Sequence, residues 1–406
     1  MNFAALPMPM RSAMALIYVA AVSFGASLLS SCSMHSQTDA TSAQAKVEAP
    51  RFEVDPMWPK PLPNNWRIGM TIGVAVDAND NVYIVHRPDT LGAQEKLAAA
   101  NPPISSCCKA APPVLVFSPA GDLIASWGLA AGARSPDGYD WPLSNHGIHV
   151  DYKGNIWIGG NGVGDNHILK FTQSGKFLLQ VGKPKASKGS SDTENFNRAA
   201  KLFVDEKTNE LYVADGYGNK RVIVLDADSG KYKRHWGAYG KAPDDSDMGP
   251  YNPDGPPPAQ FRNPVHCADL ARDGNLYVCD RANDRLQVFR TDGSFVKEAF
   301  IAKRTLGSGA VWDVAFSKDA QQKYLFLADG SNEKIYVLLR ESLQVLTQFG
   351  AGGRQPGQFF GVHSIATDSK GNLYTAETYE GKRLQKFVFK GVEPVARFDQ
   401  GVVWPR

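Results

Sequence analysis

The chain has 406 residues, of which 43% are hydrophobic and 21% charged, a composition typical of a folded globular protein rather than a disordered one. Lysine and arginine total 44 against 41 aspartates and glutamates, which gives a formal net charge of +3. This balance argues against a dedicated nucleic-acid binder, in which basic residues clearly dominate. The 38 glycines and 26 prolines indicate many turns, and the 20 Phe, 14 Tyr and 8 Trp favour strands over helices.

The first segment is predicted to be a targeting sequence. Residues 1–31 carry one charge, at Arg11, followed by a short apolar run, as in a secretory signal peptide. The run ends at Leu29-Ser-Ser-Cys32, which resembles the lipobox of bacterial lipoproteins, so Cys32 is the candidate lipidation site. A plain signal peptide with an incidental cysteine is the alternative. Residues 32–50 have the composition of a flexible tether, and we expect an exported protein of the bacterial cell envelope, periplasmic or on the outer surface, held to the membrane only by acyl chains.

Four cysteines follow the predicted lipobox, and an oxidising compartment would permit disulfides among them. Cys267 and Cys279 flank the turn at residues 272–275, and a hairpin would place them nearly opposite each other. We therefore expect a bridge between these two. Cys107 and Cys108 are adjacent in a loop rich in Pro, Ala and Ser, and the sequence leaves their state open.

A repeat organises residues 51–406. A short apolar and aromatic phrase follows a turn rich in Gly, Asn or Asp, and its six copies begin at Asn81, Asn155, Glu210, Asn275, Lys323 and Asn372. Further apolar stretches lie before and after most copies, which gives about four short strands in each unit of about fifty residues. This pattern predicts an all-β fold, a six-bladed β-propeller. Two insertions, at residues 91–113 and 241–258, are expected to be loops on a blade rim.

Three histidines share one position in alternate repeats. His146, His266 and His363 each lie eight residues before the glycine of the turn, in repeats two, four and six. Alternate blades of a six-bladed ring are related by about a third of a turn, so these side chains should converge on the central axis. Three imidazoles form the ligand set of a catalytic zinc site with an open fourth position, although iron, copper and nickel also accept imidazole. The alternative is a polar lining of the channel without a metal.

Three more side chains are predicted on the face where the histidines lie. Arg87 and Arg281 occupy the same position after the second strand of repeats one and four, and Tyr217 comes one residue later in repeat three. The second strand of a hairpin ends beside the start of the first, so these residues should surround the histidines. The alternative for Arg281, Asp215 and Asp280 is a structural role that joins neighbouring blades.

The repeat unit resembles the NHL repeat, most clearly in residues 214–222 and 279–286. The whole set resembles the peptidyl-α-hydroxyglycine α-amidating lyases, which are six-bladed NHL-type propellers with an axial zinc that cleave a carbinolamide to an amide and glyoxylate. The motifs that carry this resemblance are His86-Arg87, His146-Gly147, Asp215-Gly216-Tyr217, His266 in its proline-containing context, Asp280-Arg281 and His363.

The resemblance implies Zn²⁺ on the three histidines, Tyr217 as the general acid or base, and Arg87 as a group that stabilises negative charge. An arginine can also hold a substrate carboxylate, and Arg281 is the third candidate catalytic residue. The family has an Asp directly after its third zinc histidine that binds a structural Ca²⁺. This chain has Ser364 there, so calcium is in question. Gly361 and Gly218 also replace a Met and a Cys of the family pattern.

We therefore expect an exported, lipid-anchored, zinc-dependent lyase that acts as a monomer on a small-molecule or peptide substrate, with no nucleic-acid partner. The alternative is a non-catalytic NHL propeller that binds a peptide, glycan or protein at the cell envelope. A calcium-dependent lactonase with the same fold would need axial ligands rich in carboxylates, and the three histidines argue against it.

Overall fold

The computed structural model describes residues 47–405. The predicted signal peptide at residues 1–31, the candidate lipidation site Cys32 and most of the tether expected at 32–50 lie outside this range. Strand β1 (Glu48–Asp55) takes the last three residues of the range expected for the tether. Within the described range, no helix is long and apolar enough to cross a membrane.

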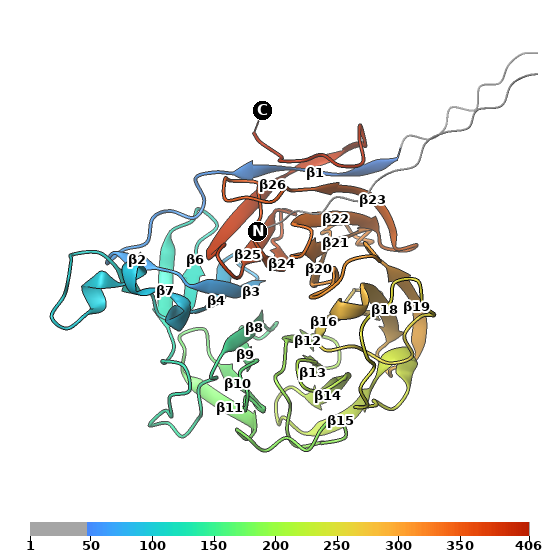
Figure 1. The fold of residues 1–406 in the computed structure, drawn as a ribbon, viewed down its shortest axis with the longest axis horizontal. Coiled ribbons are helices and arrows are strands. Elements are labelled where there is room, and N and C mark those ends of the chain that lie inside the picture. The colour runs from blue at the N-terminus through green and yellow to red at the C-terminus, as the bar shows by residue number, and fades with distance from the viewer. Residues whose placement is uncertain (1–46, 406) are drawn as a thin grey trace, which may run out of the picture. The chain divides into compact units, whose positions relative to one another are not determined.

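Six four-stranded antiparallel sheets surround a common axis, which confirms the predicted six-bladed propeller (Figure 1). From the axis outward, blade 1 contains β3 (Met70–Val76), β4 (Val82–Arg87), β6 (Val114–Phe117) and β7 (Leu123–Trp127). Blade 2 contains β8 (Asn145–Val150), β9 (Ile156–Gly160), β10 (His167–Phe171) and β11 (Phe177–Gly182). Blade 3 contains β12 (Lys201–Asp205), β13 (Glu210–Asp215), β14 (Arg221–Asp226) and β15 (Tyr232–Trp236).

The other three blades complete the ring. Blade 4 contains β16 (Val265–Leu270), β17 (Asn275–Asp280), β18 (Arg285–Arg290) and β19 (Phe295–Phe300). Blade 5 contains β20 (Asp313–Phe316), β21 (Tyr324–Asp329), β22 (Lys334–Leu339) and β23 (Gln344–Phe349). Blade 6 contains β24 (Val362–Thr367), β25 (Leu373–Glu377), β26 (Arg383–Pro394) and β1 as its outermost strand.

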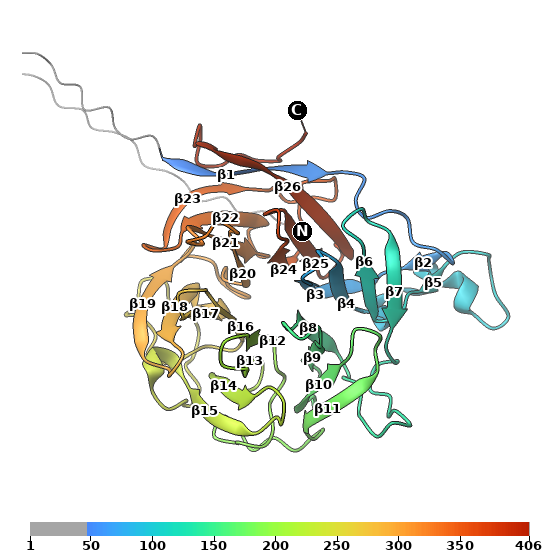
Figure 2. The same ribbon diagram turned by 180° about the vertical axis from the view of Figure 1, so that it is seen from behind.

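Strand β1 closes the ring because it pairs with the last strand of the chain. The two strands lie side by side at the outer edge of blade 6 (Figure 2). Their register runs from Glu48 opposite Pro394 to Asp55 opposite Lys386. Phe52 of β1 is 2% exposed and packs edge-on against Phe326 of blade 5. The two ends of the described chain thus share one sheet. This closes the ring, so that each described blade packs against a blade on either side.

The hydrophobic core lies between the blades. Each of six buried clusters combines side chains from two neighbouring sheets, and together the clusters cover all six blade boundaries. In the cluster between blades 2 and 3, for example, Trp157 packs with Leu202 and Leu211, and all three are fully buried. Both faces of every sheet are covered in this way, which explains the nearly continuous apolar runs in the inner strands.

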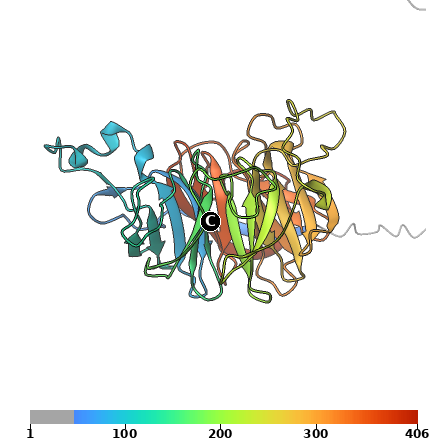
Figure 3. The same cartoon turned by 90° about the horizontal axis from the view of Figure 1, so that it is seen from below.

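Both insertions project from the same face of the wheel (Figure 3). The first contains short 3₁₀ turns, η2 (Ala93–Glu95) and η3 (Leu97–Ala99), and strand β5 (Lys109–Ala110), which pairs in parallel with β2 (Trp66–Arg67). Glu95 forms an ion pair with Lys382 of blade 6 at 2.7 Å. The insertions extend the face on which the second strand of each blade ends.

Both pairs of cysteines form disulfides. Cys267 and Cys279 are directly opposite each other in the β16–β17 hairpin, with their Cα atoms 4.8 Å apart. Cys107 and Cys108, whose state the sequence left open, are bonded to each other in the first insertion.

Candidate metal centre

The three histidines occupy equivalent places on three innermost strands. Each is the second residue of its strand, His146 in β8, His266 in β16 and His363 in β24. Their ring centroids lie 4.7–5.1 Å apart, and one ring nitrogen from each lies within 4.8 Å of the others. The triad could therefore hold a single metal ion on the axis.

A backbone carbonyl fixes the orientation of each ring. Nδ1 of His146 donates to the carbonyl of Ala200 at 2.7 Å, and Nδ1 of His363 donates to Ile72 at 2.7 Å. Nδ1 of His266 donates to Trp312 at 2.5 Å. A carbonyl can only accept, so Nδ1 carries the proton in all three rings and each Nε2 presents its lone pair to the axis. The three carbonyls belong to blades 3, 5 and 1, so each histidine also joins its blade to the next one round.

The histidines remain neutral because they are buried. Burial lowers the pKa of all three well below the usual value, and neighbouring cations add to this effect. Arg87 contributes most after burial at His146, and Arg281 does so at His266. Neutral imidazole is the form that binds a metal.

The Tyr217 hydroxyl lies within hydrogen-bonding distance of two of the three histidines. Its oxygen is 2.9 Å from Nε2 of His146 and 3.1 Å from Nε2 of His266, and it accepts a hydrogen bond from Arg281 at 3.2 Å. A hydroxyl carries one proton and can donate to only one imidazole. Among the described residues, no hydrogen bond reaches Nε2 of His363. At least two of the three Nε2 lone pairs thus have no hydrogen-bond donor among the described residues, so they are free to bind a cation.

Two arginines flank the triad. The guanidinium of Arg281 stacks on the Trp312 ring at 4.4 Å, and its Nε donates to the carbonyl of Ser308. Arg87 bridges to blade 2, since its Nε donates to the Asn145 carbonyl at 3.0 Å and its Nη2 to Asn161 at 2.8 Å. Within the described range, each arginine keeps one terminal nitrogen without a protein partner. The structure therefore brings Tyr217 into contact with the triad, places Arg281 on the Tyr217 hydroxyl, and places Arg87 near enough for its charge to act on His146.

Asp215 and Asp280 have a structural role, but their ion pairs lie within one blade, blade 3 and blade 4 respectively, rather than between neighbouring blades. Asp215 pairs with Arg221 at 2.9 Å and Asp280 pairs with Arg285 at 2.7 Å, and all four side chains are fully buried. His86, which precedes Arg87, is also fully buried. It accepts from the backbone of Gly69 and contacts the carbonyl of Pro112, away from the triad.

Sequence reasoning missed two aromatic residues near the site. Trp312 is 1% exposed and meets His363 edge-on at 5.5 Å. Tyr379 is 45% exposed, and its ring is nearly perpendicular to that of Trp312 at 6.3 Å. A Cβ at Gly361 would lie 2.9 Å from the Tyr379 ring, so this ring fills the space beside the glycine. Aligning Ala-Glu-Thr-Tyr379 with Ala-Asp-Gly-Tyr217 would have found Tyr379, because both follow the second strand of their blades.

The calcium implied by the resemblance does not fit this chain. The Ser364 hydroxyl replaces a carboxylate and donates to Asp313 at 2.9 Å. The ammonium of Lys201 already lies 3.0 Å from Asp269 and 2.5 Å from Asp313. A calcium ion requires six to eight oxygen ligands and would have to displace this ammonium.

Comparison with known proteins identifies distant relatives. No protein-family model matches the chain. It is 27% identical over 374 residues to NHL repeat-containing protein 3 of Mus musculus, covering 88% of this chain and 89% of the relative. It is 24% identical over 365 residues to peptidyl-alpha-hydroxyglycine alpha-amidating lyase 1 of Drosophila melanogaster, covering 82% and 59%. The chain thus has NHL-repeat proteins and an amidating lyase among its homologues.

Two other matches are more limited. The peptidylglycine alpha-amidating monooxygenase of Rattus norvegicus is 30% identical over 156 residues, which is 38% of this chain and 14% of that protein. A streptogramin B lyase structure aligns with 84% of this chain and 98% of its own at 10% identity and a TM-score of 0.47, a likeness too weak to bear on function.

Proposed function

We propose that the protein is a zinc-dependent lyase that cleaves a carbinolamide or a related small polar substrate. The observation that carries this proposal is the convergence of three neutral Nε2 atoms on one point, with the Tyr217 hydroxyl 2.9 Å and 3.1 Å from two of them. The homology to an amidating lyase supports the same reaction.

His146, His266 and His363 would hold the metal, which when bound lowers the pKa of a hydroxyl that it contacts. The reaction itself needs one proton transfer. The carbon–nitrogen bond of the carbinolamide breaks, its hydroxyl becomes the aldehyde of glyoxylate, and the hydroxyl proton ends on the amide nitrogen. Tyr217 is placed to relay that proton at Oη. The hydrogen bond from Arg281 holds this oxygen in place and stabilises negative charge on it during the transfer.

The arginines suit a substrate with a carboxylate. Arg87 lies on blade 1 and Arg281 on blade 4, so positive charge faces the triad from two sides. One terminal nitrogen on each is without a protein partner in residues 47–405, and a guanidinium binds a carboxylate well. A substrate carboxylate held there would place the adjacent carbon near the axis.

The test has two parts. Metal analysis of the purified protein should give one zinc per chain, lost in His266→Ala. Glyoxylate release from α-hydroxyhippurate then tests the chemistry. A zinc-loaded protein without turnover would reject the lyase assignment and leave the metal site standing.

A second function is favoured by the NHL repeat-containing relative, which aligns over nearly its whole length and whose name states no activity. In this reading the propeller binds a peptide, glycan or protein at the cell envelope. A folded, monodisperse preparation that contains no transition metal and takes up none would support the binding module over the enzyme.

We also propose that the protein is a monomer anchored at the cell envelope through Cys32. Leu29-Ser-Ser-Cys32 supports the anchor. In a bacterial host, the native chain should fractionate with membranes and Cys32→Ser should not. Equal distribution of the two would argue against lipidation.

A further inference from the structure

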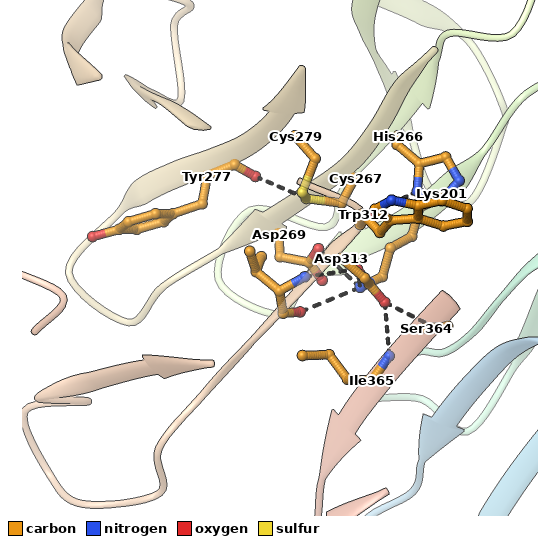
Figure 4. Close-up of a disulfide and its surroundings, with 11 residues drawn as sticks. Lys201, His266, Cys267, Asp269, Tyr277, Cys279, Trp312, Asp313, Ser364 and Ile365 are labelled. Carbon is orange, nitrogen blue, oxygen red and sulfur yellow. Dashed lines mark hydrogen bonds and ion pairs between the residues drawn. A yellow bond between two sulfur atoms is a disulfide. The ribbon is translucent and has the colours of Figure 1, made fainter. Parts of the chain in front are cut away.

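A second polar layer lies next to the histidine triad around the same axis. Lys201, Asp269 and Asp313 begin or occupy the innermost strands of blades 3, 4 and 5, and their side chains point toward one another (Figure 4). All three side chains are at most 13% exposed. A small cavity between the two layers is lined by the three histidines together with Lys201, Asp313 and Ser364. The layers are adjacent because Lys201, Asp313 and Ser364 directly follow Ala200, Trp312 and His363 in the chain.

The Lys201 ammonium is the centre of this second layer. It lies 2.5 Å from Oδ1 of Asp313 and 3.0 Å from Oδ2 of Asp269. The other oxygen of Asp313 accepts from the Ser364 hydroxyl and from the backbone of Ile365, each at 2.9 Å. The polar contacts therefore connect the innermost strands of blades 3, 4, 5 and 6.

The connection reaches blade 1 as well, since the backbone N–H of Val74 donates to the Ser364 hydroxyl at 3.3 Å. The network of polar contacts centred on the Lys201 ammonium thus reaches five of the six blades. Although burial lowers the pKa of Lys201, Asp269 and Asp313 together raise it above the usual value, so the ammonium stays charged.

We infer that the Lys201 ammonium is the resident cation of the propeller hub and takes the place of a structural calcium, so that the fold needs no calcium ion. The ammonium already occupies the space between Asp269 and Asp313, and Ser364 supplies a hydroxyl where the lyase pattern has a carboxylate. Cys267, which lies near these two carboxylates, is bonded to Cys279 and cannot act as a thiolate ligand. This inference concerns stability and does not rest on the proposed lyase activity.

Thermal unfolding of the purified protein, followed by circular dichroism, tests the inference. The melting temperature of the native protein should be equal in EGTA and in millimolar calcium. Lys201→Ala in EGTA should melt lower by roughly 5–10 °C, because two buried carboxylates lose the ammonium that lies between them. Calcium should then raise the melting temperature of Lys201→Ala by several degrees, because the vacated space offers oxygen ligands to the ion.

Lys60→Ala is the matched control. Lys60 pairs with Asp122, but both side chains are 52% exposed. Its removal should shift the melting temperature by no more than about 1 °C and create no response to calcium. If Lys201→Ala does not fold, Lys201→Arg should fold because it keeps the charge, and Lys201→Met should not.

Three results would overturn the inference. The first is a native protein that melts lower in EGTA and recovers with calcium. The second is a Lys201→Ala or Lys201→Met protein as stable as the native one, since the ammonium would then have no structural role. The third is a destabilised Lys201→Ala protein that calcium does not stabilise, because the ammonium would then not occupy a position that suits calcium.

Discussion

Replacing Tyr217 with phenylalanine isolates one hydroxyl of the candidate metal centre. The aromatic ring should stay in place, because it packs edge-on against His146 at 4.8 Å and lies 5.6 Å from the Arg281 guanidinium. Only the contacts of Oη with His146, His266 and Arg281 are lost. The residue is half-buried, so the cost in stability should be about 1 kcal/mol, the net value of one hydrogen bond.

The effect on turnover should be much larger. A positioned general acid or base contributes about 10²- to 10⁴-fold to a rate, so kcat for glyoxylate release should fall by this factor in Tyr217→Phe. The metal content should not fall, because the variant leaves all three imidazoles and their carbonyl partners intact. The KM should change little, since both arginines remain. Stopped assays at saturating substrate, with zinc measured on the same samples, separate these quantities.

Tyr379→Phe is the control for this experiment. Tyr379 lies beside Trp312 near the triad, but within the described residues no hydrogen bond joins its hydroxyl to a histidine. Its kcat should equal that of the native protein. A Tyr217→Phe variant with native kcat and full zinc content would refute the role of Tyr217 as the proton relay.

Three further outcomes are expected. Arg87→Gln should raise the KM for a carboxylate-bearing substrate about tenfold with unchanged zinc content, because one cation beside the triad is lost; a native KM would exclude Arg87 from substrate binding. Asp280→Asn should lower the free energy of unfolding by about 3–5 kcal/mol in urea titrations, since it removes the closer of the two carboxylates that pair with the fully buried Arg285 and leaves only Glu298, at 3.3 Å; a loss below 1 kcal/mol would contradict this. Burial lowers the pKa of His86 to about 4. The folded state then binds fewer protons than the unfolded state, so this residue should reduce stability as the pH falls from about 6.5 to 4, by up to ~1.4 kcal/mol per pH unit. His86→Gln should show a shallower loss in matched urea titrations, and an identical pH profile would refute the assignment.

The position of the triad could be predicted because the fold repeats. Three histidines in one phase of alternate units must meet at the axis once the ring closes, and no side-chain detail is needed for that argument. The Cys267–Cys279 pairing could be anticipated from the length of one hairpin for the same reason. Both inferences depend on local spacing and on symmetry, which a single sequence contains.

Other features depend on contacts that spacing does not encode. Lys201 shares its phase with the histidines, but a lysine at the start of a strand gives no signal until Asp269 and Asp313 are seen beside it. The composition of residues 48–50 predicts a tether rather than the start of strand β1, because the pairing of β1 with β26 joins residues more than three hundred positions apart. Trp312 gives no signal in the spacing of the histidines, although its carbonyl orients His266 and its ring supports Arg281.

The hydrogen bonds of the triad link metal binding to closure of the ring. Nδ1 of His363 donates to the carbonyl of Ile72, so the contact that orients this ligand joins the last blade to the first. The same boundary is held at the outer edge by β1, which belongs to blade 6 and leads into blade 1. A ring that opens at this boundary would therefore release one imidazole from its carbonyl, while His146 and His266 would keep theirs within blades 2 to 5. Two ligands bind a metal more weakly than three, so the closed wheel is itself a requirement of the proposed centre.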